Sequence, residues 1–484
     1  MFRLFLLGLL VWFGAVSICQ AESYNAPRQL SLEEAIYLAV RQNPNVQTAQ
    51  LNHVISKFSL EVQQWQFRPH FALQATRTTS RNYSVTPGGY VTSNVTAIQP
   101  SVSLLTPIGT QASLTATNNI SSTYNPGVAL QIIQPLMRGF GKPIVEAALY
   151  DAMDSEKISR LNVENTVRTT VTSVINAYLD VVSAQHTLDV DQNALKRAET
   201  SEQQTKLFIK AGHKAGVELV TVQADVANAQ TRIESDKNNL AQSRYALLTT
   251  IGIDPSSNVT VSSIDLIALI KKFHIPTLAQ TKERMLANDI EYQVAQITLQ
   301  GATKRSILAA DDATRWQLNL TLNGSSGNGN GGGPNAGLNS LVNGVNQSDS
   351  AMLTLNIPID DRAAKNSLAI AKISFHEAEI ALQQEKWSKE TNAINGWNSI
   401  FSAKRGLYFA ENAERLQDQT YTISFKKYSY GLIDSLELQS AQQQLSAAQQ
   451  SLVNAQINYL KSLVNLDLLL GSTLQTWDVK VRYS

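Results

Sequence analysis

The sequence predicts a mainly α-helical fold with a β-structured membrane portion, in which long helical hairpins are joined to short strands. Three observations support this prediction. A stretch of helical heptads occurs twice, from Gly212 to Gly252 and from Gly431 to Gly471, and the two copies align without a gap at an offset of 219 residues. Each copy follows a long run with little Pro or Gly, which is typical of a continuous helix. Segments with an apolar period of two precede these helices, as strands would.

Composition and the N-terminal residues limit the possible classes. The chain is 43% hydrophobic and only 16% charged, with a formal net charge of +1, so charge gives no reason to expect nucleic acid as a partner. Residues 1–21 resemble a secretory signal peptide, with an apolar run at Leu4–Val16 and cleavage expected after Ala21. Lipidation of Cys19, the only cysteine, is the less favoured alternative, because Ile18 before it is not small.

The first structural repeat is expected to span residues 22–252. A capping box at Ser31–Glu34 opens a helix that Asn43-Pro44 interrupts. From about 70 to 135, apolar and polar residues alternate between turns rich in Gly, Pro, Asn and Ser, so we expect strands there. A long helical hairpin over 143–252 follows, and its first arm is on the order of 100 Å long.

The second half repeats this plan. The remaining segments are an equatorial connector (253–277), a second structural repeat (278–471) with strands at about 315–358 and a helical hairpin at 362–471, and a C-terminal tail (472–484). Between its strands, residues 324–350 are rich in Gly, Asn and Ser and have no apolar period, so we expect an exposed loop.

The predicted strands carry apolar residues on one face and polar residues on the other, as in Trp316–Asn323. In water the apolar face would be a large exposed patch, whereas in a membrane it faces lipid. Strand edges cannot stay unpaired in lipid, and each repeat has too few strands to close a barrel alone. Closure therefore requires several chains, and the heptad hairpins likewise bury their apolar stripes only by packing side by side.

The order of these features resembles the TolC family of outer-membrane efflux proteins over essentially the whole mature chain. The resemblance rests on the opening Leu30–Ile36 with Asn43–Asn45, the internal duplication, the strand-to-helix passage Gln134–Gly141 and the Leu-Leu-Gly helix end at 469–471. It implies a homotrimer with a 12-stranded β-barrel in the outer membrane, continued by an α-helical barrel through the periplasm. The region 70–135 is longer than the family's two-strand pattern, so a hairpin around Pro107–Gly109 would add strands.

The resemblance also implies a function. The chain would be a passive exit duct for small molecules in the outer membrane of a Gram-negative-type bacterium, in contact with outer-membrane lipid. Its helical tips would dock a periplasmic adaptor (membrane fusion) protein, and an inner-membrane pump of the RND or ABC type would supply the energy. Two alternatives stay open: a duct for exported proteins in a type I secretion system, and a periplasmic coiled-coil scaffold without a pore.

The site residues that the resemblance implies lie where the helices reverse. Glu218 and Glu437 begin the returning helices, where the family narrows its periplasmic aperture with acidic residues; a favourable charge at a helix N-terminus is the alternative account. Tyr428 matches the family's gate tyrosine and would hydrogen-bond Glu218. The family's basic gate residue and its second acidic residue are replaced by Ile433 and Ser440, so half of the expected polar gate is missing.

Docking of the adaptor is expected at the turns themselves, at Gly212, Gly216, Gly431 and Leu432. A plain structural reason for the glycines is that a helix C-cap favours a residue with positive φ, and both roles are compatible.

No pattern in the sequence indicates an enzyme, a cofactor or a metal site. The six histidines do not pair at metal-ligand spacing, and no phosphate-binding loop or nucleophile motif is present. The pairs Asp311-Asp312 and Asp360-Asp361 stand at helix–strand junctions, where helix capping explains them better than acid–base catalysis.

Overall fold

The computed structural model describes residues 28–483, except 85, 87, 121–123, 263, 328–338, 340–341 and 345. The predicted signal peptide at 1–21 and most of the predicted loop at 324–350 lie outside the described residues. The chain divides into two compact units. The first contains the described residues up to Asn43, with Val171–Lys272 and Ala403–Lys461, and the second contains Pro44–Thr170, Phe273–Ser402 and the residues from Ser462 onward.

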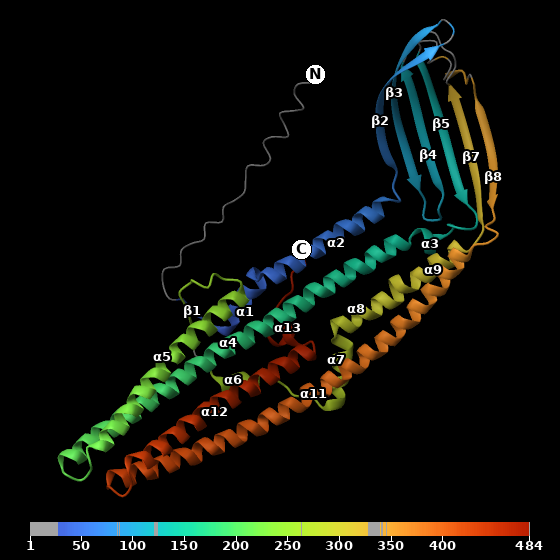
Figure 1. Ribbon diagram of the computed structural model, residues 1–484. Coiled ribbons are helices and arrows are strands. Elements are labelled where there is room, and N and C mark those ends of the chain that lie inside the picture. Colours follow the sequence, from blue (N-terminus) through green and yellow to red (C-terminus); the bar gives the residue numbers. More distant parts are fainter. Residues whose placement is uncertain are drawn as a thin grey trace. The chain divides into compact units, whose positions relative to one another are not determined.

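The first unit contains the ends of two long helical hairpins (Figure 1). Helices α4 (Ala147–Lys210) and α5 (Val217–Ile251) form one hairpin, and α11 (Arg362–Ser429) and α12 (Ser435–Leu469) form the other. The heptad repeat accounts for the packing, because side chains at heptad spacing are buried in both copies. These include Val222, Ala229, Ile233, Leu247, Leu438, Leu445, Tyr459 and Leu466.

The first unit also contains a short parallel strand pair that the sequence analysis missed. Strand β1 (Arg28–Leu30) pairs with β6 (Val259–Val261), and helices α1 (Leu32–Gln42) and α6 (Leu266–Lys271) lie next to them in the chain. Tyr178 of α4 is fully buried here, and its hydroxyl lies 2.9–3.0 Å from the main-chain oxygens of Leu30 and Ser262. Three-residue strands leave no readable period, so pattern alone does not reveal them.

Each repeat contains the same joint between a short helix and the end of its heptad helix. In the first repeat, Asn43 follows α1 and its Nδ2 donates to the carbonyl oxygen of Thr250 at 2.7 Å. In the second, Asn288 ends α7 (Leu278–Asn288) and its Nδ2 donates to the carbonyl oxygen of Leu470 at 2.9 Å. Each asparagine thereby satisfies a carbonyl that the last helical turn leaves without a partner.

The second unit combines helices with a sheet. Its shorter helical elements are α2 (Pro44–Trp65), α3 (Lys142–Val145), α7, α8 (Ile290–Thr298), the π-helical turn η1 (Leu299–Thr303), α9 (Lys304–Ala313) and α13 (Thr473–Thr476). The helix expected from residue 143 onward is therefore interrupted at Glu146, and the π-helical turn η1 separates α8 from α9. At η1, Gly301 packs so close to Asp154 that a side chain would clash with it. Among the described residues, none of the helices is both long enough and apolar enough to cross a membrane.

The strands form one antiparallel sheet in the order β2-β3-β4-β5-β7-β8 (Figure 1). They are β2 (His70–Ser84), β3 (Gly89–Leu105), β4 (Gln111–Ile120), β5 (Tyr124–Pro135), β7 (Gln317–Gly327) and β8 (Ser348–Asn356). The hairpin around Pro107–Gly109 is the β3–β4 connection, so the first repeat contributes four strands. The predicted loop begins too early, because β7 continues through Gly324 to Gly327.

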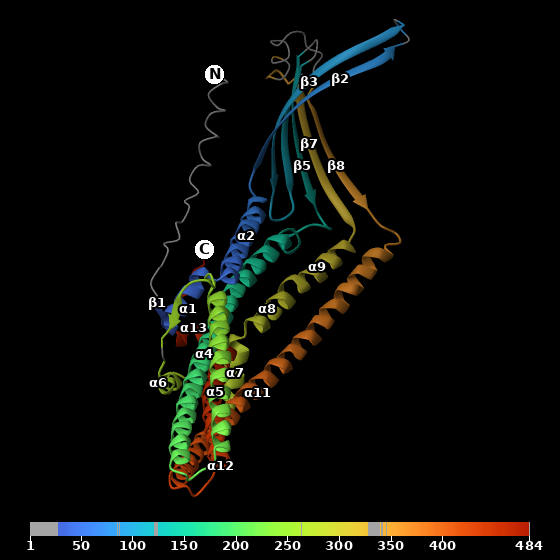
Figure 2. The same ribbon diagram turned by 60° about the vertical axis from the view of Figure 1, so that its left-hand side comes forward.

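One face of this sheet is apolar across all six strands. Phe71 lies opposite Val102, Val102 opposite Leu114, and Leu114 opposite Leu130, and cross-strand partners share a face. Leu320 and Leu353 continue the same face on β7 and β8. Beyond Thr96, where pairing with β4 stops, β2 and β3 pair only with each other, and Figure 2 shows this hairpin extending past the ends of the other strands.

Candidate functional site at the hairpin tips

Both hairpins reverse direction through the same backbone conformation. Gly212 and Gly431 have φ of 77° and 72°, in the left-handed region that glycine adopts without strain. In each turn, the N–H after the glycine donates to the carbonyl five residues earlier at 2.9 Å, which defines a Schellman cap. Gly216 differs, because it precedes α5 with an ordinary φ of −59°. Leu432 is 72% exposed beside its glycine.

Lys214, which the sequence analysis did not select, links the two tips. Its Nζ donates to Oε2 of Glu218 at 2.8 Å within the first hairpin. It also lies 3.5 Å from the carbonyl oxygen of Ile433 and 4.1 Å from the ring centroid of Tyr428, both in the second hairpin. The Lys214 side chain is only 7% exposed, so this cation is largely withdrawn from water. An ion pair and a cation–π contact thus meet at one amine.

Tyr428 is fully buried, and its hydroxyl lies 2.5 Å from Oγ1 of Thr205 on α4. The Thr205 hydroxyl already donates its proton to the carbonyl oxygen of Ser201 at 2.7 Å, so Tyr428 is the donor to Thr205. The resemblance implied a Tyr428–Glu218 hydrogen bond. Within the described chain these side chains have other partners, Thr205 for the tyrosine and Lys214 for the glutamate.

Several other tip residues are open to solvent. Glu437 is exposed on the first turn of α12, and its backbone N–H donates to Oδ1 of Asp434 at 2.8 Å, so Asp434 caps the helix. Ser440 is also exposed. Six large apolar side chains at the two tips are more than 60% exposed, and we call them the tip collar: Leu207, Val217, Val220, Tyr430, Leu432 and Leu436.

Behind the tips, a series of polar contacts holds α4 against α12. They are Ser201 with Gln442 (2.9 Å), Arg197 with Ser446 (2.9 Å), Asp191 with Gln450 (3.3 Å) and Asp180 with Lys461 (2.5 Å). Residue numbers rise along one helix as they fall along the other, so the helices are antiparallel and in fixed register. Most of these contacts involve an amide or a hydroxyl, in keeping with the low charge of the sequence.

A pair of acidic side chains lies between the two arms of the first hairpin. Asp236 of α5 is 9% exposed and faces Asp191 of α4, which is 2% exposed. Burial raises the pKa of Asp236 to about 6, and the hydrogen bond and charge of Asp191 add to the shift, while Arg232 opposes it. Arg232 lies 3.8 Å from Asp191. The Asp236 carboxyl therefore takes up a proton in mildly acidic conditions.

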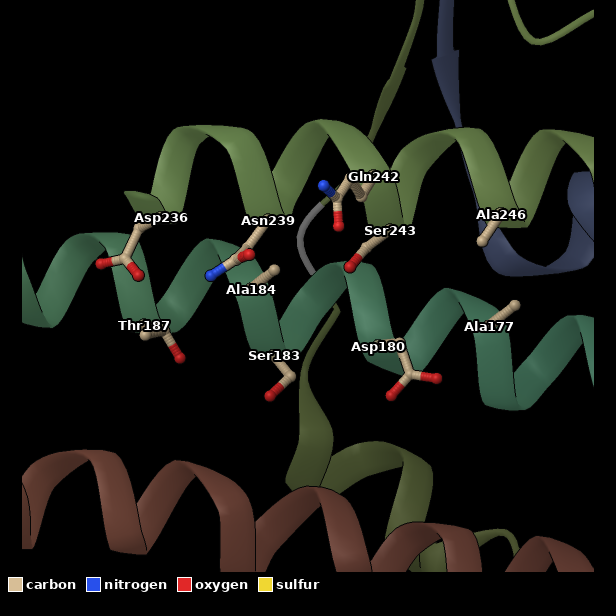
Figure 3. A pocket seen from close by; sticks show the side chains of 10 residues that line it. All are labelled: Ala177, Asp180, Ser183, Ala184, Thr187, Asp236, Asn239, Gln242, Ser243 and Ala246. Atoms are coloured by element: carbon tan, nitrogen blue, oxygen red, sulfur yellow. The ribbon is translucent and has the colours of Figure 1, made fainter. Parts of the chain in front are cut away.

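Asp236 also borders an open groove of about 470 Å³ between α4 and α5, shown in Figure 3. The lining side chains are small or polar: Ala177, Asp180, Ser183, Ala184 and Thr187 from α4, and Asp236, Asn239, Gln242, Ser243 and Ala246 from α5. The two carboxylates in it already have partners within the chain, so we assign the groove no ligand. Within the described part of the chain, no group of three or more His, Cys, Asp or Glu is placed to hold a metal.

The sequence contained a signal for Lys214. Lys214 and Ile433 are separated by 219 residues, the offset that aligns the two repeats. The cation missing from the second tip therefore stands at the equivalent position of the first tip. Thr205 gave no such signal, because it is one of many polar residues on a long helix.

An amphipathic sheet with strands of membrane type, joined to long coiled hairpins, defines a class of outer-membrane channels with a helical periplasmic part. The model of the family described as outer membrane efflux protein matches residues 35–253 and 282–472, so the chain belongs to that family. This confirms the TolC-family prediction. The chain is thus an outer-membrane efflux duct of tripartite systems that extends into the periplasm, which favours the duct over a scaffold without a pore.

Solved structures share the fold at low sequence identity. The CmeC outer membrane channel of Campylobacter jejuni has a TM-score of 0.68 and 14% identity, with 91% of this chain and 86% of that chain covered. The open-state MtrE channel of Neisseria gonorrhoeae has a TM-score of 0.67 and 18% identity, with 92% and 89% covered. The outer membrane protein VceC of Vibrio cholerae has a TM-score of 0.66 and 15% identity, with 91% of this chain and 96% of that chain covered. No curated protein gives a significant match.

Proposed function

We propose that three copies of this chain form the duct and that the hairpin tips close its periplasmic end. Outer-membrane channels of this family are trimeric and work with partner proteins in tripartite systems. The observation that carries the proposal is the position of Lys214, which binds Glu218 of its own hairpin and contacts Tyr428 and Ile433 of the other. Separating the hairpins requires breaking these contacts, so they stabilise the closed form.

In this proposal, Glu218 and Glu437 line the aperture. A three-fold assembly places six carboxylates around one narrow opening, which favours cations and disfavours anions. Lys214 offsets the charge of Glu218 while the tips are closed. Glu437 is exposed to water on the first turn of α12. Tyr428 anchors α11 to α4 through Thr205, so the gate moves only when the hairpins part.

Docking of a periplasmic adaptor is assigned to the tip collar and to the turns at Gly212, Gly216, Gly431 and Leu432. Apolar side chains as exposed as Leu432 (72%) and Tyr430 (80%) gain free energy when a partner covers them. The adaptor connects the duct to an inner-membrane pump of the RND or ABC type, which supplies the energy. The chain itself catalyses no reaction, and its cargo is proposed to be small molecules.

The gate is tested by single-channel recording in planar bilayers. Replacing Glu218, Tyr428 and Glu437 together by Ala is expected to raise conductance several-fold and to lower cation selectivity. Glu234→Ala is the matched control, because this glutamate lies on α5 with a 72% exposed side chain and pairs with nearby Lys237. Unchanged conductance and selectivity in the triple variant would contradict the aperture assignment.

Docking is tested separately with a purified adaptor encoded beside the duct gene. Leu432→Asp is expected to weaken adaptor binding at least tenfold and to restore drug sensitivity in cells. Leu416→Asp serves as the control, because Leu416 is 53% exposed on α11 but lies several turns from the tip. Equal loss of binding in both variants would place the docking surface elsewhere.

A further inference from the structure

We propose that the membrane barrel of this duct has 18 strands, six from each of three copies, instead of the 12 that the family resemblance implies. In this arrangement β8 of one copy pairs with β2 of the next, so the partner of each sheet edge is a second copy of this chain. The inference rests on the proposed trimer and extends it by fixing the number of strands and the interface.

The first observation is that the sheet has two open edges. In the order β2-β3-β4-β5-β7-β8, one side of β2 and one side of β8 pair with no other described strand. Six strands are too few to close on themselves, because even the smallest membrane barrels have about eight. In lipid, unpaired backbone donors and acceptors are too costly to persist, so both edges need strands from other copies.

The second observation is that β3 and β4 are built into the sheet at its helical end. Their connecting turn packs against the passage from β5 to α3. A side chain at Gly109 would come within 2.7 Å of the Gly139 carbonyl oxygen, and the N–H of Gly141 donates to the Ile108 carbonyl oxygen at 3.2 Å. Gly139 in turn donates to Oδ2 of Asp312, at the end of α9, at 2.8 Å. The added hairpin is therefore a fixed part of the base of the sheet.

The third observation is the continuous apolar face. Leu114 of β4 stands between Val102 of β3 and Leu130 of β5, on the same side of the sheet. If β2 and β3 lay outside the membrane layer, their lower halves would not need to continue this face. Phe71 of β2 and Leu353 of β8 are 80% and 63% exposed in one copy. Apolar side chains are expected on both edge strands if these strands face lipid.

Strand direction also fits closure between copies. Every neighbouring pair in the sheet is antiparallel, and β2 leads away from α2 while β8 leads back to α11. The two edge strands therefore run in opposite directions, and joining β8 to β2 of the next copy continues the antiparallel ladder without a break.

The strand number sets the width of the pore. With strands about 4.8 Å apart and tilted by about 40°, an 18-stranded barrel has a backbone diameter of roughly 36 Å, against roughly 24 Å for 12 strands. The cross-section thus more than doubles. The membrane part then offers little size selection, and the narrowest point of the duct is the periplasmic tip.

Disulfide trapping between copies tests the proposal. Cys19 is the only cysteine and precedes residue 22. In the chain from residue 22 onward, any disulfide therefore forms between the introduced cysteines. Thr354→Cys on β8 is combined in turn with Ala72→Cys, Gln74→Cys or Thr76→Cys on β2, all on the polar face. Such a bond requires Cβ atoms within about 4.5 Å, so the scan over β2 allows for the unknown register. The control pairs Thr354→Cys with Thr115→Cys on β4.

At least one β8–β2 pair is expected to give a covalent trimer on non-reducing gels after oxidation in membranes, and the β8–β4 pair is expected to give none. A trimer linked through β8 and β4, or no β8–β2 link in a protein that is still trimeric by native mass, would overturn the 18-stranded barrel and leave the duct intact. A monomeric native mass would overturn the proposed trimer itself.

Discussion

The two hairpin tips have the same backbone and different side chains. Gly212 and Gly431 adopt nearly equal positive φ and the same capping hydrogen bonds. The first tip contributes a cation at Lys214, whereas the second has Ile433 at the equivalent position and offers only its carbonyl oxygen. The second tip contributes the aromatic ring of Tyr428, over which the lysine lies.

This difference shows that the duplication has kept the geometry of the turn but divided the binding groups between the copies. Neither tip supplies both partners of this cation–π contact. The two hairpins are therefore complementary, and in the proposed gate the closed state depends on their contact. A substitution at one tip should therefore weaken the contacts that the other tip makes.

The largest effect is expected from removing the cation of the first tip. Lys214→Met keeps the length of the side chain but leaves Glu218 without its partner, which costs about 1–3 kcal/mol for a partly buried charged hydrogen bond. Single-channel conductance should rise several-fold as the tips loosen. Lys206→Met is the control, since the exposed amine of Lys206 pairs with Glu202 of its own helix at 2.8 Å, and ion pairs between neighbouring helical turns contribute little. Equal conductance in both variants would contradict the role of Lys214.

Moving the cation to the other tip tests the complementarity directly. Lys214→Ile combined with Ile433→Lys restores one charge at the repeat-equivalent position. Conductance should return most of the way to that of the unaltered protein, because an amine at 433 can reach the same carboxylate. A double variant as open as Lys214→Met would show that the two positions are not equivalent.

A smaller effect is expected from the second tip. Tyr428→Phe keeps the ring under Lys214 but removes the hydroxyl that donates to Thr205, which costs about 1 kcal/mol. The thermal midpoint of the hairpins should fall by a few degrees while conductance rises less than in Lys214→Met. Tyr421→Phe on the same helix is the comparison. A conductance as high as that of Lys214→Met would mean that the hydroxyl, and not the cation, holds the gate.

The shared backbone predicts equal costs at the two capping glycines. Gly212→Ala and Gly431→Ala add a Cβ that meets nothing within 4 Å, so the only cost is the positive φ, about 1 kcal/mol each. Gly216→Ala is the matched control, because its φ is −59° and its Cβ would also meet nothing. Chemical denaturation should show two equal losses and no loss for the control. Clearly unequal losses would mean that the two turns are not alike.

The smallest expected effect is a pH dependence of stability in the first hairpin. Because the pKa of Asp236 is raised from 3.8 to about 6, folding favours the protonated acid. Its contribution to stability is complete below pH 3.8 and is lost as pH rises through about 6. Asp236→Asn should therefore raise the thermal midpoint at pH 8 and change it little at pH 4. Exposed Asp189→Asn on α4 should show no such pH dependence, and a similar gain at both pH values for Asp236→Asn would rule out the titration.

Much of the fold was predictable because long helices and strands repeat their apolar pattern many times in the sequence. The heptads of the two copies and the clean alternation at Leu318, Leu320 and Leu322 identified the hairpins and β7. The outer halves of β2 and β3 lie within the predicted strand region, but alternation does not identify them one by one, because residues such as Thr78, Thr79 and Ser80 are polar on both faces. An exposed hairpin needs no apolar face, so its period disappears from the sequence.

The candidate site was predictable only in part. Gly212 and Gly431 were found because a helix reversal without glycine is strained. The partners of Glu218 and Tyr428 were not, because they depend on which side chain of a packed neighbour reaches into the contact. Lys214 could be predicted from the repeat offset, whereas the role of Thr205 became visible only in the folded structure.

The way in which helices and strands are joined limits the number of strands that such a duct can have. In each repeat the chain enters the sheet from a helix and returns to a helix: α2 to α3 around four strands, and α9 to α11 around two. Because both helices stand at the same end of the strands, the number of crossings in a repeat must be even. A threefold duct of this kind can therefore gain or lose strands only six at a time, and its bore is available only in discrete sizes.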